Sequence, residues 1–538
     1  MRNSIFWAGV ILCSVLTSAR SNTPTTGEII YRRGILPSGK PVAGDRESGG
    51  SASGATAACI NCHRRSGLGT VEGRIVIPPI TARYLYEAAP GSAAEFSTAE
   101  GGTAPHRLIP YTDATLARAI REGIAPDGRS FNYLMPRYPL GDDAMASLIT
   151  YIKGLSNGQE PGVVGDTLHF ATIITPDADP VKRKAMLEVM EHFFAAKNLF
   201  SRGPAPPLQA SRRLAFRVLR KWQLHVWDLS GEPETWEEQL RKKFRAEPVF
   251  AVISGLGGKD WAPIHRFCEQ ESIPCLFPNV DLPVVAEEDF YDVYFSKGVL
   301  LEAQLMARQI QASAKTADLR RVVQVYRDED VGKAAAGALR KQIAASGLAT
   351  VDRSLSTGAA ANEIGAAIRT AASNDALVLW LRPDDLRELP SEAPNNPAVF
   401  MSGVMGELEQ APLNNSWRGA VQMTYPYELP ALRAARLNYV LAWFKIQKIP
   451  VACERTQVDT YVACGILAEN LDHMLDNFVR DYLVENVEVM LSPRVVNGYY
   501  TRLGLGPGQR FASKGGYVVR FSASDEKKLI PGGDWIVP

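Results

Sequence analysis

The stretch Phe250-Ala251-Val252-Ile253-Ser254-Gly255-Leu256 says most about the fold of this chain. Its apolar residues predict a β-strand that ends in a glycine-containing loop. A helical pattern follows over Trp261 to Gln270, and a second apolar run, Ile273-Pro274-Cys275-Leu276-Phe277-Pro278, comes after it. A strand, a helix and another strand in this order predict a parallel β-α-β unit.

The same alternation extends over most of the chain after Asp166. The first series places strands and helices in turn at Leu168 to Ile174, Lys182 to Ala196, Gln223 to Asp228, Trp236 to Phe244 and Val249 to Ser254. A second series begins near Arg321, with a strand at Val322 to Tyr326, helices at Gly332 to Ala345 and Ala361 to Ala372, and a strand at Ala376 to Leu381. Such alternation predicts parallel sheets with helices on both faces.

Length and composition indicate more than one domain. The 538 residues are 46% hydrophobic and 22% charged, which is typical of a soluble globular protein of two or three domains. Residues 156–165 lack periodicity and contain glycine and proline, so they predict a linker between a domain at 27–155 and a domain at 166–538. The net charge of +1 provides no global field that would attract nucleic acid.

The N-terminus has the pattern of a secretory signal. Arg2 precedes an apolar run from Ile5 to Leu16, and Thr17-Ser18-Ala19 suits cleavage after Ala19. This run is shorter than the roughly 20 apolar residues that a spanning helix needs. We therefore expect residues 1–19 to be removed and the protein to be periplasmic, without a membrane span after the signal is removed.

The short motif Cys59-Ile60-Asn61-Cys62-His63 has the Cys-x-x-Cys-His pattern of c-type haem attachment. Cys59 and Cys62 would form thioethers with the haem vinyl groups, and His63 would be an axial ligand of the iron. A zinc half-site or a thioredoxin-like pair is the alternative. A zinc site would need a second ligand pair, but the next cysteine in the sequence is Cys268. A thioredoxin-like pair would need a β-α-β setting, which the loop before Cys59 does not provide.

Residues from Gly27 to about Leu155 resemble a class I cytochrome c, which implies an all-α domain with one covalent haem c. Met135, in Tyr133-Leu134-Met135-Pro136-Arg137-Tyr138, matches the family's sixth ligand, and the carbonyl of Pro78 would fix the ring of the proximal histidine. Met145 is a rival, but it falls within a helical pattern as a core residue would. His106 is another, in a glycine- and proline-rich insertion.

The large domain resembles the type I periplasmic solute-binding proteins, the group of the branched-chain amino acid receptors. The resemblance rests on residues 250–256 and 273–278, and it implies a two-lobed α/β fold with a ligand cleft. The hydroxyl groups that this family offers to amino acids are missing from the two cleft segments. Asp260, Trp261 and Asp281 stand there instead, and they would suit an alcohol, an amine or a metal-bearing ligand. The alternative is that Trp261 packs in the core and Asp260 caps a helix.

Four cysteines remain outside the signal and the haem motif. In an oxidising compartment their local spacings favour disulfides between Cys268 and Cys275 and between Cys453 and Cys464. Four buried free thiols are the alternative. The histidines outside the haem motif, among them His265, are scattered in sequence and are interpreted as core or surface residues.

These features together predict a multidomain protein: an all-α cytochrome c domain followed by a two-lobed α/β solute-binding-protein-like domain. The main functional prediction is a monohaem cytochrome that carries single electrons to and from a periplasmic redox partner protein and is not itself an enzyme. A first alternative is a solute receptor of the ABC-transporter type or a redox-coupled ligand sensor. A second is a haem-dependent oxidoreductase with substrate in the large-domain cleft.

Overall fold

The computed structural model divides the chain into two compact units, Met1–Gly158 and Gln159–Pro538. It describes residues 24–47, 49–72, 75–87, 109–131, 133–200, 220–474, 477–492, 496–500, 502–522, 525 and 528–538. The expected signal peptide, residues 1–19, and the rival ligand His106 lie outside the described residues. Across the described ranges, no helix has both the length and the apolar character needed to cross a membrane.

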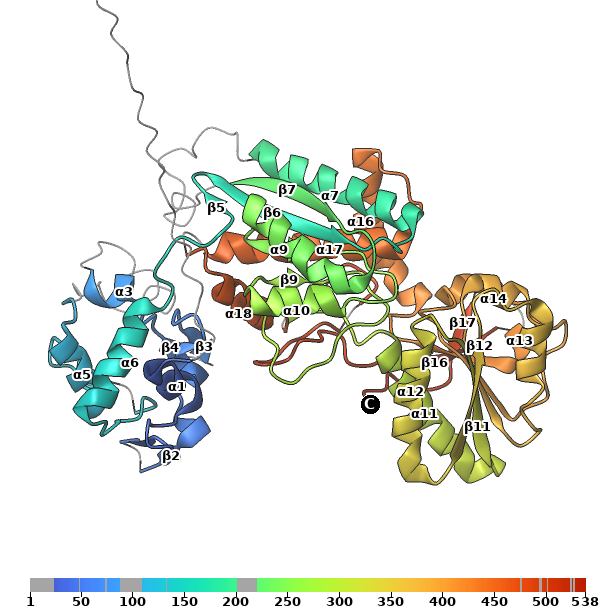
Figure 1. Ribbon diagram of the computed structural model, residues 1–538, viewed down its shortest axis with the longest axis horizontal. Helices are drawn as coiled ribbons and strands as arrows, with labels where there is room; N and C mark the ends of the chain where they lie inside the picture. The colour runs from blue at the N-terminus through green and yellow to red at the C-terminus, as the bar shows by residue number, and fades with distance from the viewer. Residues whose placement is uncertain are drawn as a thin grey trace, which may run out of the picture. The chain divides into compact units, whose positions relative to one another are not determined.

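The first unit is a small helical body with two short β-ladders (Figure 1). Its helices are α1 (Thr26–Arg33), η1 (Gly54–Ala57), α2 (Ile60–His63), α3 (Ala82–Tyr86), α5 (Asp113–Glu122) and α6 (Asp142–Gly154). Antiparallel pairs join β1 (Ala43–Asp45) to β2 (Ser51–Ser53) and β3 (Thr70–Glu72) to β4 (Ile75–Ile77). The unit is therefore mainly helical, but the expected all-α fold is not what the structure shows.

The core of the first unit forms where α1 meets α6. Gly27 permits this close approach, since a Cβ atom there would lie 2.1 Å from the backbone oxygen of Ser147. Tyr31, Leu148 and Met145 are buried in the same apolar cluster, with Met145 only 3% exposed. Met145 therefore occupies the core position that its helical spacing indicates.

Lobe one of the second unit is built on a mixed sheet. Its strands are β5 (Val163–Val164), β6 (Thr167–Ile174), β7 (Lys221–Asp228), β8 (Ala251–Ile253), β9 (Cys275–Leu276) and β10 (Asp292–Val293). They lie in the order β10-β9-β8-β6, with β7 and β5 also paired to β6, and every pair except β5 with β6 is parallel. The predicted β-α-β unit at the opening stretch is thus confirmed as β8, α10 (Ala262–Gln270) and β9.

Helices cover both faces of this sheet. Side chains that alternate along β6 enter two different apolar clusters: Phe170 packs with residues of α7 (Pro180–Phe200) and α17 (Glu454–Met474), and Ala171 packs with residues of α9 (Trp236–Ala246) and α10. Helices α16 (Pro430–Gln447) and α18 (Arg480–Leu491) complete the lobe, as can be followed in Figure 1.

Lobe two contains a seven-stranded sheet in the order β12-β11-β13-β14-β15-β16-β17. The strands are β11 (Arg321–Arg327), β12 (Ala349–Leu355), β13 (Ala376–Trp380), β14 (Ala398–Met401), β15 (Val421–Tyr425), β16 (Tyr517–Phe521) and β17 (Leu529–Pro531). The first five are parallel and the last two antiparallel. Its helices are α11 (Val299–Ala317), α12 (Gly332–Ile343), α13 (Ala361–Ile368), α14 (Pro383–Arg387) and α15 (Asn415–Ala420).

The chain passes between the lobes three times: from β10 to α11, from β15 to α16, and from the segment after α18 to β16. At the first passage Gly298 has φ 52° and ψ −130°, a backbone conformation that side chains rarely permit. A Cβ atom there would lie 2.1 Å from the backbone oxygen of Asp281. This passage therefore requires glycine.

Candidate functional site

A large cleft of about 1030 Å³ opens between the two lobes of the second unit. Its walls are made largely by segments that follow the carboxyl ends of parallel strands, where open α/β sheets usually bind ligands. Lobe one contributes Asp177 after β6, Gly258 after β8 and Asp281 after β9, and lobe two contributes Asp330 after β11 and Arg382 after β13. The cleft therefore lies where the topology places a binding site.

A network of ion pairs crosses the cleft at its centre. Arg382 of lobe two donates to Asp281 of lobe one at 2.7 Å and to Asp330 of its own lobe at 2.8 Å. Arg455, in α17, lies 3.6 Å from the other carboxylate oxygen of Asp281. Two carboxylates and two guanidinium groups thus balance in charge, and Asp281 joins the lobes.

Asp281 is ionised in this setting. Burial by itself would raise its pKa, but the positive charges of Arg382, Arg455 and Lys182 outweigh that effect and lower the pKa to about 2. The side chain of Asp281 is 15% exposed and that of Arg382 is 30% exposed, so solvent screens this pair only partly.

The loop between β8 and α10 is held close to the end of β6. The hydroxyl of Thr175 donates to Asp177 at 2.6 Å and accepts from the amide of Gly258 at 3.0 Å. The amide of Lys259 donates to the second oxygen of Asp177 at 2.8 Å. A Cβ atom on Gly258 would lie 2.3 Å from the Asp177 carboxyl carbon, so glycine is needed for this contact. The wall of lobe one is therefore an ordered, polar surface.

Of the three predicted ligand residues, the structure places only Asp281 on the cleft. Trp261 is 2% exposed and packs in the apolar cluster under α9 and α10. Gly255 and Gly257 leave room for its indole, because a Cβ atom on either would lie within 2.7 Å of the ring. Asp260 accepts from the amide of Ala262, the first residue of α10, at 2.8 Å. Trp261 thus packs in the core, as in the alternative interpretation, and Asp260 bonds to the first turn of the helix without being its N-cap residue.

Sequence reasoning missed Arg382 and Arg455. Arg382 lies two residues after the end of the apolar strand β13, a position that could have marked it as a residue at the carboxyl end of a sheet. Arg455 lies at the start of α17, and no local pattern indicates that this helix returns to lobe one.

The first unit has a second cavity, about 430 Å³ in volume and mostly apolar. Cys59, Cys62, His63 and Met135 all line it, whereas Met145 does not. His63 Nδ1 lies 3.2 Å from the carbonyl oxygen of Pro78. Burial lowers the pKa of His63 to about 4, although the contact with Pro78 acts in the opposite direction, so the imidazole is neutral at pH 7. The four residues predicted to hold a haem therefore surround one pocket.

The structure does not contain the two predicted disulfides. Each of the six described cysteines is a free thiol. Cys464 lies within α17 and Cys453 just before it, so about 11 residues of helical rise separate them by roughly 16 Å, which is too far for a disulfide. The thiols of Cys268 and Cys275, by contrast, are neighbours.

Comparison with known proteins identifies the fold of the second unit. No protein-family model matches the sequence, and no curated protein matches it either. Among solved structures, a fatty acid ABC transporter substrate-binding protein from Thermomonospora curvata matches with a TM-score of 0.53 and 15% identity, over 71% of this chain and 95% of its own.

Two further matches have TM-scores of 0.50. They are a substrate-binding periplasmic protein from Ralstonia solanacearum, at 15% identity over 68% of this chain and 99% of its own, and a possible leucine/isoleucine/valine-binding protein from Rhodopirellula baltica SH 1, at 12% identity over 68% and 96%. The chain therefore contains a two-lobed α/β fold of the type I periplasmic-binding-protein kind, as its sequence predicted.

These matches correct the main functional prediction. The chain was expected to be a cytochrome that carries single electrons, with the large domain as an appendage. The solved structures that share its fold are substrate-binding proteins, and they cover about two thirds of the chain. The prediction of an electron carrier is therefore corrected, because these matches agree better with the alternative of a solute receptor, and they give no support to the redox partner protein.

Proposed function

We propose that the protein is an exported solute receptor that binds a small polar molecule in the cleft between the two lobes of its second unit. The observation that carries this proposal is the cleft itself, which segments after the carboxyl ends of parallel strands in both sheets line with charged side chains from both lobes. The predicted signal peptide and the name of one structural match, a substrate-binding periplasmic protein, support a periplasmic location.

The chemistry of the walls favours a solute with positive charge or several hydrogen-bond donors. Acidic side chains outnumber basic ones along the cleft, and the two arginines at its centre are already paired with Asp281 and Asp330. Glu329 and Glu407 add carboxylates from lobe two. The charged lining therefore favours amines, polyols and zwitterions, and we propose these as the ligand class.

The test is a thermal-shift screen of the full chain against amines, amino acids, polyols and carboxylates, followed by calorimetric titration of any solute that raises the Tm. A solute at about 100 times its Kd should stabilise the protein by roughly 2.7 kcal/mol. Asp281→Asn should weaken binding at least about tenfold, because a buried charged partner is lost. Asp228→Asn is the matched control, since Asp228 forms an exposed pair with Arg183 in the same lobe. If solutes bind with the same affinity to the Asp281 variant, the cleft is not the site.

We further propose that the cavity of the first unit holds a covalent haem c, bound through Cys59 and Cys62 with His63 and Met135 as axial ligands. The fit of the residues supports this: two thiols and a neutral imidazole at one wall, a methionine in the same lining, and an apolar interior. The haem would supply a redox-active iron within the receptor. The contact of His63 Nδ1 with the Pro78 carbonyl would orient the ring toward that iron.

This cofactor is tested by producing the protein in a host that attaches haem c and measuring its mass and its visible spectrum after denaturation. The wild-type chain should retain haem covalently, and the double variant Cys59→Ser/Cys62→Ser should not. Cys464→Ser is the control, because Cys464 is buried in α17 of the other unit. Met135→Ala should alter the spectrum of the folded protein, whereas Met145→Leu should not. A wild-type chain without haem and with both thiols free would contradict the proposal.

A further inference from the structure

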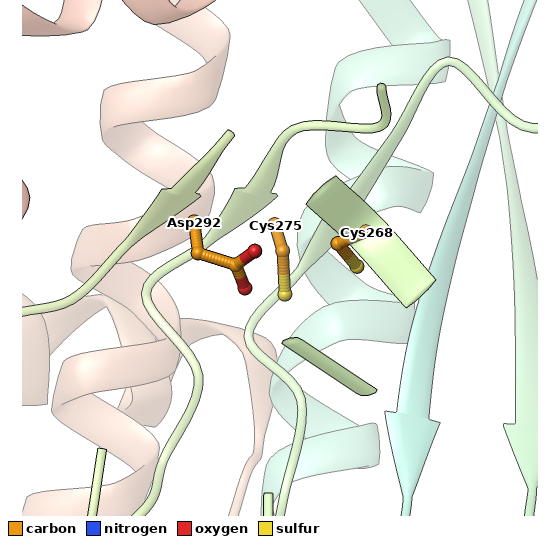
Figure 2. A group of neighbouring side chains, drawn as sticks. All are labelled: Cys268, Cys275 and Asp292. Atoms are coloured by element: carbon orange, nitrogen blue, oxygen red, sulfur yellow. The ribbon is translucent and has the colours of Figure 1, made fainter. Parts of the chain in front are cut away.

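A buried cluster of metal-ligand side chains lies in lobe one, apart from the residues that line the cleft. Cys268, Cys275 and Asp292 are 0%, 1% and 0% exposed, and one ligand atom from each lies within 4.8 Å of the others. Figure 2 shows the three side chains beside one another, with the Asp292 carboxylate directed toward Cys275; they belong to α10, β9 and β10. A second group, His265, Glu269 and Asp292, meets the first at Asp292.

The local structure explains why these residues meet. In α10, His265, Cys268 and Glu269 are spaced by three and four residues, so they share one face of the helix. In the sheet, Cys275 is the register partner of Asp292 across the parallel pair β9 and β10. Partners in adjacent strands project to the same face of a sheet, and α10 covers the face to which Cys275 points. Helix and strands thus deliver thiol, carboxylate and imidazole groups to one buried spot.

The hydrogen bonding of Asp292 in this buried cluster is incomplete. Both of its carboxylate oxygens are buried, and within the described part of the chain neither meets the geometry of a hydrogen bond; the neighbouring groups are Glu269 and His265 Nδ1, which lies 3.5 Å from Oδ1. Glu269 beside it cannot donate as a carboxylate, and its oxygens accept from the amides of Phe290, Tyr291 and Asp292. An ionised carboxylate held here without a cation would cost several kcal/mol. A cation bound between Asp292 and the thiols would remove that cost.

His265 has the environment of a metal-binding histidine. Its Nδ1 atom lies 3.5 Å from Asp292 Oδ1 and 2.8 Å from the hydroxyl of Tyr294. Its Nε2 atom, on the opposite side of the ring, lies 2.9 Å from Asp289 Oδ2. A proton on Nε2, the side on which Asp289 lies, would leave a lone pair on Nδ1, which here meets the Tyr294 hydroxyl and which a metal would have to take over.

We propose that Cys268 Sγ, Cys275 Sγ and Asp292 bind a zinc-type divalent cation in lobe one, and that His265, which belongs to the adjoining group at Asp292, is the nearest imidazole to the fourth position. Thiolate sulfur with a carboxylate oxygen matches the ligand preference of Zn²⁺, whereas Ca²⁺ and Mg²⁺ prefer oxygen alone. Binding would displace the two thiol protons to solvent. Two thiolates and one carboxylate would leave the site with a net charge of −1, the same as in common Cys₃His zinc sites.

The chemical alternative is a disulfide between Cys268 and Cys275, which an oxidising compartment permits. A disulfide would consume both thiols but would leave both oxygens of Asp292 without a partner. The position of Asp292, opposite Cys275 in the sheet, is what favours the metal.

The experiment uses the full chain, purified without chelators, and measures bound zinc by mass spectrometry of the metal, so that any haem iron is counted separately. We expect about one zinc ion per chain after dialysis. Asp292→Asn and Cys275→Ser should each lower the retained zinc at least about tenfold, and Cys464→Ser, which changes a buried thiol outside the cluster, should not.

A second measurement keeps the proposal testable if those variants fail to fold. The wild-type protein is treated with a chelator, and its Tm is followed before and after zinc is returned; a reversible fall in Tm is expected. The two thiols are then alkylated in denaturant and located by peptide mass. A peptide linked by a Cys268–Cys275 disulfide would overturn the proposal, and so would two free thiols in a chain that takes up no zinc from solution.

Discussion

Arg382→Met is the variant that most directly tests the ion-pair network across the cleft. Methionine keeps much of the length of the side chain but removes the guanidinium group that joins Asp281 to Asp330. The pKa of Asp281 is lowered from 3.8 to about 2, and at about 1.4 kcal/mol per pKa unit this corresponds to roughly 2.5 kcal/mol in favour of the ionised carboxylate. Burial acts in the opposite direction, so Arg382, Arg455 and Lys182 together contribute at least that much.

The expected loss can be stated as a range. Arg455 remains 3.6 Å from Asp281 in the variant and keeps part of the stabilisation, but Asp330 also loses its partner. We expect the free energy of unfolding of the second unit to fall by about 2–4 kcal/mol at pH 7. The double-mutant cycle with Asp281→Asn should give a coupling free energy of about 2 kcal/mol. The exposed pair Arg183–Asp228 is the control, and Arg183→Met should cost no more than about 1 kcal/mol.

The pH dependence gives an independent check. The folded pKa of Asp281 lies below its unfolded value, so the stabilisation is fully present above about pH 4 and is lost as the pH falls toward 2. The difference between wild type and Arg382→Met should therefore shrink over this window. Urea unfolding at several pH values, followed by circular dichroism, measures it. A coupling free energy below about 0.5 kcal/mol at pH 7 would refute the reasoning that this network joins the lobes.

Three further predictions concern single side chains of the second unit, each measured by urea unfolding. Gly298→Ala should lower the free energy of unfolding by more than about 3 kcal/mol, because the new Cβ atom would meet the backbone oxygen of Asp281 at 2.1 Å. The control is Gly337→Ala, which adds a Cβ atom at an open helical position and should be neutral or stabilising. Trp261→Ala should lower the free energy of unfolding by about 3–5 kcal/mol but leave the affinity for a cleft solute unchanged. A large loss of affinity without a loss of stability would contradict the assignment of Trp261 to the core. Burial raises the pKa of Glu302 to about 7, although hydrogen bonds from Ser402, Thr424 and two backbone amides lower it. Because this folded value lies above the unfolded value of 4.5, the free energy of unfolding should fall as the pH rises from about 4.5 to 7. Glu302→Gln should flatten that pH dependence.

Much of the fold was predictable because the strands of both sheets are short apolar runs with helical patterns between them. The predicted strand at Val322 to Tyr326 is observed as Arg321–Arg327, and the one at Ala376 to Leu381 as Ala376–Trp380. Helix ends were less accurate: the helix predicted to reach Ala372 ends at Ile368. Periodicity records which face of an element is buried, but the last turn of a helix depends on capping and on neighbouring segments.

The cleft was predictable in place but not in composition. Asp281 was identified because it follows a strand that the family resemblance assigns to the cleft. Trp261 looked like a ligand-binding aromatic residue because no sequence pattern shows that Gly255 and Gly257 make room for its ring in the core. Arg382 was missed because its partner, Asp281, is 101 residues away in the chain. Contacts between lobes depend on how the sheets meet, which local sequence does not encode.

The position of the cluster around Asp292 has a consequence for the receptor. Cys268 lies on the helix that follows the cleft loop containing Gly258, and Cys275 lies on the strand that leads to Asp281. A metal that joins these two residues would tie together two of the segments that form the lobe-one wall of the cleft. It would do so from beneath, because the cluster side chains are buried and do not line the cleft. Removal of the metal should therefore lower the stability of lobe one first, and it should weaken solute binding only as far as it loosens those segments. Equal solute affinity in the zinc-bound and zinc-free protein would show that the hydrogen bonds from the amides of Gly258 and Lys259 to Thr175 and Asp177 are enough to hold the lobe-one wall.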